Sequence, residues 1–467
     1  MDKETDYLQL AREAYESGHE LRKRRRRYKQ FTYGKQWEDV ILTPDGESVT
    51  EREYARSMGT RPLSNNMIRQ MVKCVVGNFR EGLHEEIDEV DTALKRRNAL
   101  DELDSRALEE FLISGCAIQR VVDEHRMDGS GVWVDNVSPE EFFINEYRDP
   151  RGTDIELVGM LHSMSRRELL MRFGRGSSSR ALEIGRIYDA EARRGWGDIG
   201  DERTTGFDKA PAGRCRVIEV WTLESRNILK CHDSECAELF CVSPSEGRKI
   251  AKLNAARQAA GKGVIDVMPR TTMRWHCRYF APTGELLDEM DSPYAHGMHP
   301  FVVKMYPLID GEVHSFVEDV VDQQKYINRL ITLMDHILGV SAKGVLLFPM
   351  ELKPDGMTWR EIGDMWANTN TVIPYCSSAT GAEPKQIINN GANMGVSQLL
   401  DIELKLFEQI SGVSGALQGR LSRADSSAAL FEAQTRNSTV ALRDLLDSFH
   451  SFRQLRNAKI NFSKFSH

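Results

Sequence analysis

The spacing of apolar residues changes twice along this 467-residue chain, and that change limits the fold more than any other feature. Between Met67 and Phe79 apolar residues recur every three or four positions, which is the spacing of one buried helix face. From Ala117 to Ile144 short apolar runs alternate with turn residues, as in β-strands. Helical spacing then returns from Ser315 to Leu338. Helices followed by strands and again by helices predict an α+β fold, mainly α-helical, rather than a doubly wound sheet.

Weaker patterns complete the expected elements. Helices are predicted at 100–114, 181–194, 249–262, 396–411 and 426–460, and strands at 216–223 and within 264–289. Hydrophobic residues form 40% of the chain and charged residues 28%, so a globular protein of two to four structural units is expected.

Several protein classes are disfavoured by composition. No apolar run reaches the roughly 18 residues that cross a bilayer, and the start lacks the apolar core of a signal peptide, so we expect a cytosolic origin and no membrane partner. A formal net charge of −8 disfavours a generally basic nucleic-acid binder. This net charge does not exclude a protein that lines a channel for DNA, because a channel wall along which DNA slides should avoid strong contacts to phosphates.

Motifs of nucleotide chemistry are incomplete. The sequence Gly195 to Gly200 has the glycine spacing of a dinucleotide fingerprint, but it follows Arg194 and enters a polar loop instead of joining a strand to a helix. Gly261 and Lys262 are followed by Gly263, where a phosphate-binding loop needs Ser or Thr. We therefore expect neither an enzyme nor a bound cofactor.

Two clusters keep a metal-dependent nucleic-acid enzyme open as an alternative. Cys231, Cys236 and Cys241 lie close in sequence, although their spacing is wider than in a zinc knuckle, and buried thiols are the simpler interpretation. The other cluster is Glu318, Asp319 and Asp322. These carboxylates would suit magnesium, or they form an exposed helix face with cations three or four positions away.

Five segments, in this order, resemble portal proteins of tailed bacteriophages, closest to those of podovirus-like phages and prophages. They are Tyr33-Gly34-Lys35-Gln36-Trp37; Arg61-Pro62-Leu63-Ser64-Asn65-Asn66-Met67-Ile68; Val137-Ser138-Pro139-Glu140-Glu141-Phe142 with Arg148-Asp149-Pro150; His299-Pro300-Phe301 and Asp310-Gly311 leading to Asp322-Gln323-Gln324-Lys325-Tyr326-Ile327-Asn328-Arg329; and Ile410-Ser411-Gly412-Val413 with Leu417-Gln418-Gly419. The resemblance covers most of the chain, and its specificity comes from the ordered set rather than from one motif.

The resemblance implies a head-to-tail connector, a ring of about twelve subunits through which double-stranded DNA is packaged and ejected. Implied partners are identical subunits, the terminase large subunit, a head–tail adaptor, and the major capsid and scaffolding proteins. The implied location is the capsid vertex of the virion, with host cytoplasm during assembly. Another structural head–tail ring protein is an alternative, although such adaptors are usually shorter.

Portal proteins are divided into wing, stem, clip and crown, and the sequence suggests where these fall. We expect the wing at 1–240, a first stem helix at 241–263, a β-rich clip at 264–313, a second stem helix at 314–340, a wing return with tunnel loop and tunnel helix at 341–420, and crown helices at 421–467.

The same placement suggests candidate site residues, none of them catalytic or metal-binding. They are Asn389, Asn390 and Asn393 for a loop that contacts DNA in the channel; Glu318, Asp319, Asp322, Lys325 and Arg329 for the stem helix along the channel; and Arg270, Arg274 and Arg278 for clip contacts to motor or adaptor.

Overall fold

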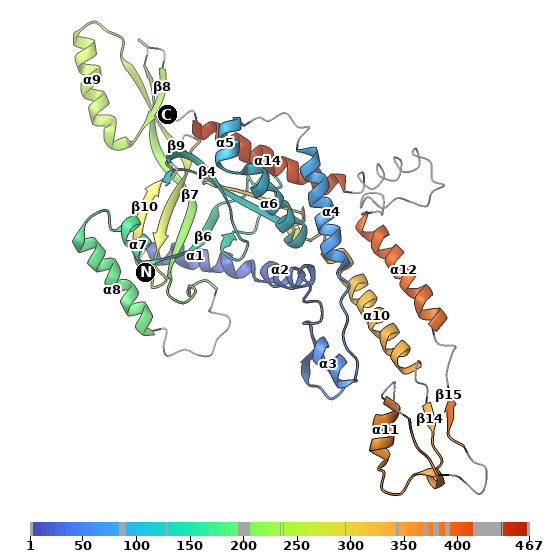
Figure 1. Ribbon diagram of the computed structural model, residues 1–467. Helices are drawn as coiled ribbons and strands as arrows, with labels where there is room; N and C mark the ends of the chain where they lie inside the picture. The colour runs from blue at the N-terminus through green and yellow to red at the C-terminus, as the bar shows by residue number, and fades with distance from the viewer. Residues whose placement is uncertain are drawn as a thin grey trace. The chain divides into compact units, whose positions relative to one another are not determined.

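A computed structural model describes residues 3–83, 90–126, 129–194, 206–233, 235–236, 238–294, 296–341, 345–367, 372–376, 383–387, 393–413, 440 and 442–464. The chain divides into two compact units, each assembled from distant segments (Figure 1). Unit 1 contains residues 1–25, 79–315 and 444–467, and unit 2 contains 26–78 and 316–443. The mixture of helix and sheet confirms the predicted α+β class.

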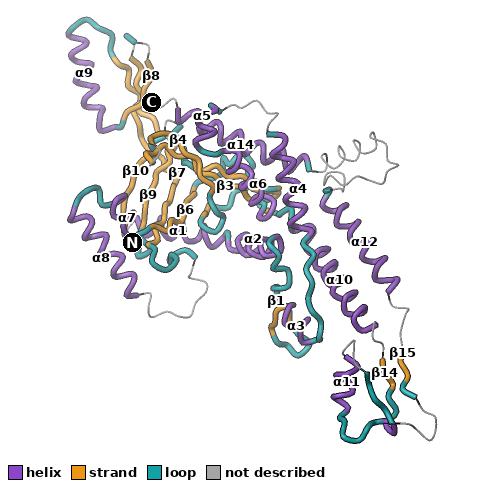
Figure 2. The backbone as a smooth tube through the Cα atoms, in the orientation of Figure 1, coloured by secondary structure: helices purple, strands orange, loops and turns teal. Residues whose placement is uncertain are grey.

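A six-stranded antiparallel sheet forms the centre of unit 1 (Figure 2). Its strands, in spatial order, are β10 (Leu286–Asp291), β9 (Ile265–Phe280), β7 (Cys215–Asp233), β6 (Leu157–Met164) and β5 (Phe142–Ile144), with β8 (Glu238–Val242) paired to β7 beyond this path. A second sheet has the order β11 (Phe301–Met305), β3 (Cys116–Arg126) and β4 (Gly129–Asn136). Both sheets contribute to one apolar core, in which Trp221 and Cys277 from the large sheet join Phe301 from the small one.

Helices cover these sheets by burying one apolar face each. Helix α1 (Lys3–Ser17) places Leu8, Ala11 and Tyr15 against strands β5 to β7. The remaining helices of this unit are α5 (Thr92–Arg97), α6 (Leu100–Ser114), α7 (Arg166–Phe173), α8 (Ser178–Arg194), α9 (Gly247–Ala259) and α14 (Arg443–Lys464), with the 3₁₀ turn η2 (Pro244–Glu246) and the hairpin β12 (Pro307–Ile309) and β13 (Glu312–Val313). Helix α7 begins where the Ser165 side chain accepts a hydrogen bond from the Glu168 amide.

Buried ion pairs fix the C-terminal helix α14 to unit 1. Arg453 and Arg456 both contact Asp104 of α6, and the Arg453 Nε to Asp104 Oδ2 distance is 3.0 Å. Lys459 Nζ donates to the carbonyl oxygens of His299 and Phe301 at 2.7 and 2.6 Å. Buried charges need such partners because an isolated charge in the interior is costly.

Strands β7 and β9 continue as a two-stranded ribbon past their neighbours in the sheet, pairing from Ile218–Phe280 to Asp233–Ile265. At the tip, β8 joins the ribbon and α9 packs on it through a small core that includes Cys231, Ile250 and Ile265. Figure 1 shows this tip extending from the sheet of unit 1.

Two helices and a small mixed tip form the larger part of unit 2. Helix α10 (Val321–Ser341), preceded by the 3₁₀ turn η3 (Glu318–Val320), packs along α12 (Asn393–Ser411). Between them lie β14 (Val345–Leu347), η4 (Met350–Leu352), α11 (Trp359–Ala367) and β15 (Lys385–Ile387). Because β14 and β15 are antiparallel partners, the chain leaves along α10 and returns along α12. The N-terminal part of the unit adds β1 (Val40–Leu42), β2 (Ser48–Thr50) and α3 (Glu51–Ser57), together with residues of α2 (His19–Thr32) and α4 (Met67–Gly82).

The helices predicted at 249–262 and within 315–338 correspond to α9 and α10. Helix α9 belongs to unit 1, where it covers the ribbon tip, whereas α10 belongs to unit 2 and packs on α12. The strands within residues 264–313 have partners elsewhere in the chain, since β9 pairs with β7 and β11 pairs with β3. Such long-range pairing cannot be read from local spacing.

Candidate assembly surfaces

A buried amide network holds α10 within unit 2. Gln324 Oε1 accepts the Met67 amide at 2.9 Å, and Gln324 Nε2 donates to the Asn65 carbonyl at 2.7 Å. Asn328 accepts the Asn65 amide at 2.9 Å and donates to Gln36 Oε1 at 2.7 Å. Every residue of this network lies in a segment that carries the sequence resemblance. The network satisfies buried polar groups that would otherwise oppose folding.

A charged cluster lies beside the amide network. Lys325 Nζ is 2.6 Å from Asp39 Oδ2 and 2.8 Å from Glu51 Oε1, and Arg329 is 3.2 Å from the same Glu51 oxygen. Burial alone would raise the pKa of Asp39, but hydrogen bonds from Arg27 and Lys325 outweigh it and hold that pKa below its usual value. Lys325 and Arg329 therefore neutralise carboxylates of their own unit.

The acidic residues predicted for the same helix lie at its start. Glu318 and Asp319 belong to η3, and Asp322 is exposed in the first turn of α10. Carboxylates at a helix N-terminus are stabilised by the helix dipole. Across the described ranges, no group of three His, Cys, Asp or Glu residues is arranged to hold a metal ion. Of the cysteines weighed for zinc, Cys231 is buried and Cys236 exposed.

The predicted channel asparagines are described only in part. Asn389 and Asn390 lie outside the described residues. Asn393 is the first residue of α12, and its side chain is outside the description as well.

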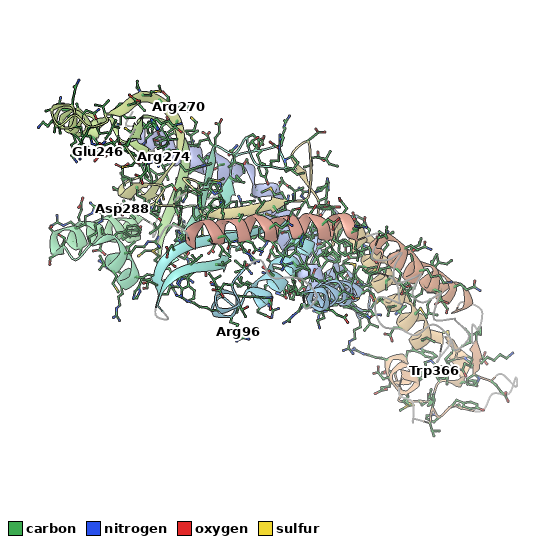
Figure 3. All side chains as sticks on the ribbon, turned by 90° about the horizontal axis from the view of Figure 1, so that it is seen from above. Arg96, Glu246, Arg270, Arg274, Asp288 and Trp366 are labelled. Atoms are coloured by element: carbon green, nitrogen blue, oxygen red, sulfur yellow. The ribbon has the colours of Figure 1, made fainter. Side chains whose placement is uncertain are left out.

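The three predicted clip arginines differ in their surroundings. Arg278 is buried, and its guanidinium is 2.6 Å from Glu224 and stacks over the Tyr7 ring, so it presents no free charge to a partner. Arg270 and Arg274 are exposed on the ribbon of unit 1 (Figure 3). Only these two are therefore candidates for a contact surface.

Exposed apolar side chains follow one face of α12. Ile402, Leu406 and Ile410, four positions apart, are 52%, 38% and 43% exposed. The inward face of the same helix carries Phe407, which is buried. The apolar surface of α12 thus extends beyond its buried side onto an exposed flank, which is available for another partner.

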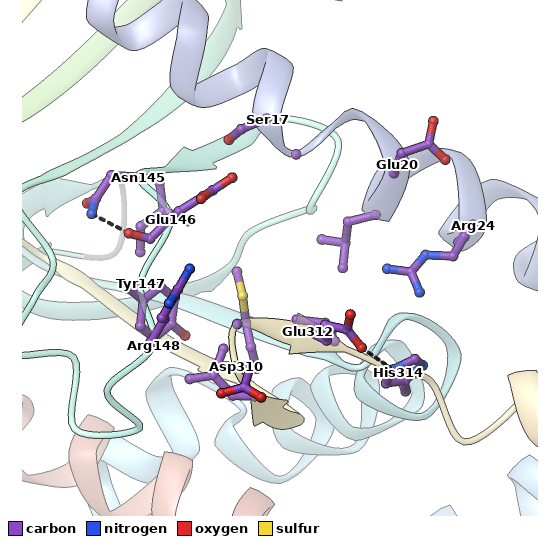
Figure 4. A pocket seen from close by; sticks show the side chains of 17 residues that line it. Ser17, Glu20, Arg24, Asn145, Glu146, Tyr147, Arg148, Asp310, Glu312 and His314 are labelled. Atoms are coloured by element: carbon purple, nitrogen blue, oxygen red, sulfur yellow. Dashed lines mark hydrogen bonds and ion pairs between the residues drawn. The ribbon is translucent and has the colours of Figure 1, made fainter.

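A cavity of about 430 Å³ opens in unit 1 between α1–α2, the segment after β5, and the β12–β13 hairpin (Figure 4). Its rim carries both signs of charge, including Glu20, Arg24 and Arg148. The hydrogen bonds drawn there join Asn145 to the Glu146 carbonyl and His314 to Glu312. Neither pair joins a nucleophile to a base.

No sequence pattern predicted the buried ionic network around Glu219. Glu219 of β7 is fully buried and accepts bonds from Arg120 of β3 at 3.1 Å and from Trp221 Nε1 at 2.7 Å, while His162 of β6 lies 2.5 Å away. Burial would raise the pKa of Glu219, but the Arg120 charge and the His162 and Trp221 bonds hold it far below its usual value. The partners come from three strands, and only their pairing brings them together.

The described helices include none long and apolar enough to cross a bilayer. Comparison with protein-family models matches the P22-like phage portal protein family over residues 87–460. Comparison with curated proteins gave no match. Because the family match spans well over half of the sequence, the chain belongs to the P22-like phage portal proteins, which are structural, non-enzymatic components of the phage.

Proposed function

We propose that the chain is one subunit of a portal ring, the head-to-tail connector through which the phage genome enters and leaves the capsid. The family match supports the portal role. The observation that carries the more specific proposal is the arm of unit 2, defined as α10, the tip from 345 to 387 and α12.

This arm replaces the stem and clip expected from the sequence. Helix α10 has 21 residues, which corresponds to roughly 30 Å at 1.5 Å per residue. We assign α10 as the outgoing stem helix, the tip as the clip and α12 as the returning stem helix. Residues 314–340 thus remain stem, but as the first of its two helices rather than the second.

The apolar stripe of α12, defined as Ile402, Leu406 and Ile410, supports packing of arms against each other in a ring. These apolar side chains are exposed in the single subunit, and burial of each against a neighbouring arm would favour association. Identical subunits repeated by rotation satisfy such a surface on every copy.

The tip of the arm supports a docking role for the terminase large subunit during packaging and for a head–tail adaptor afterwards. Met350, Trp359 and Val372 are 81%, 44% and 86% exposed there. Methionine and tryptophan are enriched in protein–protein interfaces. We propose in addition that Asn389, Asn390 and Asn393, which follow β15 in the sequence, contact DNA.

Mass photometry of the purified chain, with negative-stain averages, tests the ring. We expect a discrete species of about a dozen copies with an axial opening. Monomers or dimers alone, at micromolar concentration and over a range of salt, would contradict the proposal.

A further inference from the structure

The ribbon of unit 1, defined as residues 225–274, is covered on one face only. Strand alternation places Leu229 and Cys231 on the face where α9 packs, with Ile250 of α9 against them. Arg257 of α9 pairs with Asp233 on the same face, with both distances 2.8 Å. Among the described residues, the other face contributes no side chain to this small core.

The opposite face, called the bare face here, mixes cations with apolar side chains. By the strand register it includes Lys230 of β7, Met268, Arg270 and Arg274 of β9, and Leu239 of β8, together with one exposed acid, Asp266. Met268 and Leu239 are 68% and 65% exposed. Within the described part of the chain, none of the three cations forms an ion pair, in contrast to Arg278 farther along β9.

The ribbon is net positive, whereas the remainder of the chain, called the body here, is net negative. Residues 225–274 contain nine Lys and Arg against five Asp and Glu, a formal charge of +4. The whole chain carries −8, so the remainder carries −12. The ribbon of one copy is therefore complementary in charge to the body of another, and opposite potentials favour association.

The residues also indicate how a partner would bind. The outer edge of β9 has no strand partner from Ile265 to Arg274 among the described residues, but Pro269 lacks an amide hydrogen there and opposes addition of a strand. A partner would therefore contact the ribbon through the bare face and not by adding a strand to its edge. Exposed methionine and leucine among arginines are typical of a protein interface, whereas a phosphate backbone offers nothing to bury them.

We propose that the bare face binds the acidic body of a neighbouring copy of this chain, so that the ribbon joins adjacent subunits. This inference rests on the ring assembly proposed above. It assigns Arg270 and Arg274 to contacts between subunits rather than to contacts with the packaging motor.

Charge reversal tests the proposal. R270E/R274E should raise the concentration needed for assembly by about tenfold or more, because attraction to the neighbour becomes repulsion. The matched control R248E/K252E makes the same change in the net charge of residues 225–274, but on α9, over the covered face. If the contact depends on the bare face and not on net charge alone, the control should assemble like the wild type. Unchanged circular dichroism and melting temperature would show that both variants fold.

The outcomes separate the two proposals. If the wild type forms no ring, the proposed function itself fails. If the wild type forms rings and R270E/R274E forms them equally well, only the ribbon contact is overturned, and loss of DNA binding in that variant would identify nucleic acid as the partner instead.

Cross-linking locates the contact directly. R270K/R274K introduces amines that a carbodiimide can couple to nearby carboxylates, in rings assembled from equal amounts of ¹⁴N- and ¹⁵N-labelled chains. We expect coupled peptides of mixed isotope content, joining the ribbon to a carboxylate of another copy. Coupling confined to peptides of one isotope would overturn the proposal.

Discussion

Asn328 of α10 donates a hydrogen bond to Gln36 at 2.7 Å, although 292 positions separate them in the chain. Asn65 joins the same network through its backbone amide and carbonyl. Three separate segments that resemble portal proteins thus converge on one buried set of amides. Their shared role is to hold the first helix of the arm in unit 2.

Asn328→Ala should destabilise unit 2 by about 2–4 kcal/mol. Asn328 is 1% exposed, and its removal leaves the Asn65 amide and Gln36 Oε1 buried without a partner. Hydrogen exchange of the α10 amides measures the loss as reduced protection. Asp335→Asn, at an exposed position of the same helix, should change stability by less than about 0.5 kcal/mol. Equal protection in both variants would count against the network.

Lys325→Met should weaken unit 2 in a pH-dependent way. The folded pKa of Asp39 lies below its unfolded value near 3.8, so the contribution of this carboxylate to stability is complete above that value and is lost as pH falls through the folded pKa. The difference in melting temperature between variant and wild type should therefore narrow as pH falls from 6 to 3. Arg329→Met is the control, because Arg329 does not contact Asp39. A difference that stays constant with pH would exclude this coupling.

Leu406→Asp should impair assembly and leave the subunit folded. The substitution places a carboxylate in the centre of the apolar stripe, and we expect the concentration needed for assembly to rise about tenfold or more. Gln409→Asp introduces the same charge at an exposed position beside the stripe. Sedimentation velocity compares the two, and rings of Leu406→Asp that form as readily as the control would exclude the stripe as an interface.

Glu219→Ala should destabilise unit 1 by about 3–5 kcal/mol. The substitution leaves the Arg120 guanidinium buried without its carboxylate, and an unpaired buried charge is strongly unfavourable. Urea unfolding followed by circular dichroism provides the measurement. Glu156→Gln changes an exposed side chain directly before β6 and should have little effect on the stability of unit 1. A loss below about 1 kcal/mol for Glu219→Ala would show that the network contributes little.

Local patterns predicted the elements well and their partners poorly. The helices α4 and α6 and the strands β3, β4 and β5 lie where apolar spacing placed them, because each buries one face. The pairing of β9 with β7 and of β11 with β3 joins distant segments, which no local period encodes. Local spacing therefore could not indicate that α10 packs along α12.

For the candidate site residues too, local spacing predicted the positions but not the partners. Arg270, Arg274 and Arg278 share one face of a strand, as four-residue spacing requires, but only tertiary packing decides that Arg278 pairs with Glu224. One alternative paired the carboxylates of this helix with cations three or four positions away, but Lys325 forms ion pairs with Asp39 and Glu51, which lie far from it in the sequence. The predicted region 426–460 is confirmed as helix only over α14, since 414–439 lie outside the described residues.

A cryo-electron microscopy reconstruction of the purified assembly would show how the arms of neighbouring subunits pack. We expect a rotationally symmetric ring in which α10 and α12 of each subunit form an arm, with Ile402, Leu406 and Ile410 buried against the neighbouring arm. A ring in which these three side chains face solvent, or an assembly without an axial opening, would contradict this expectation.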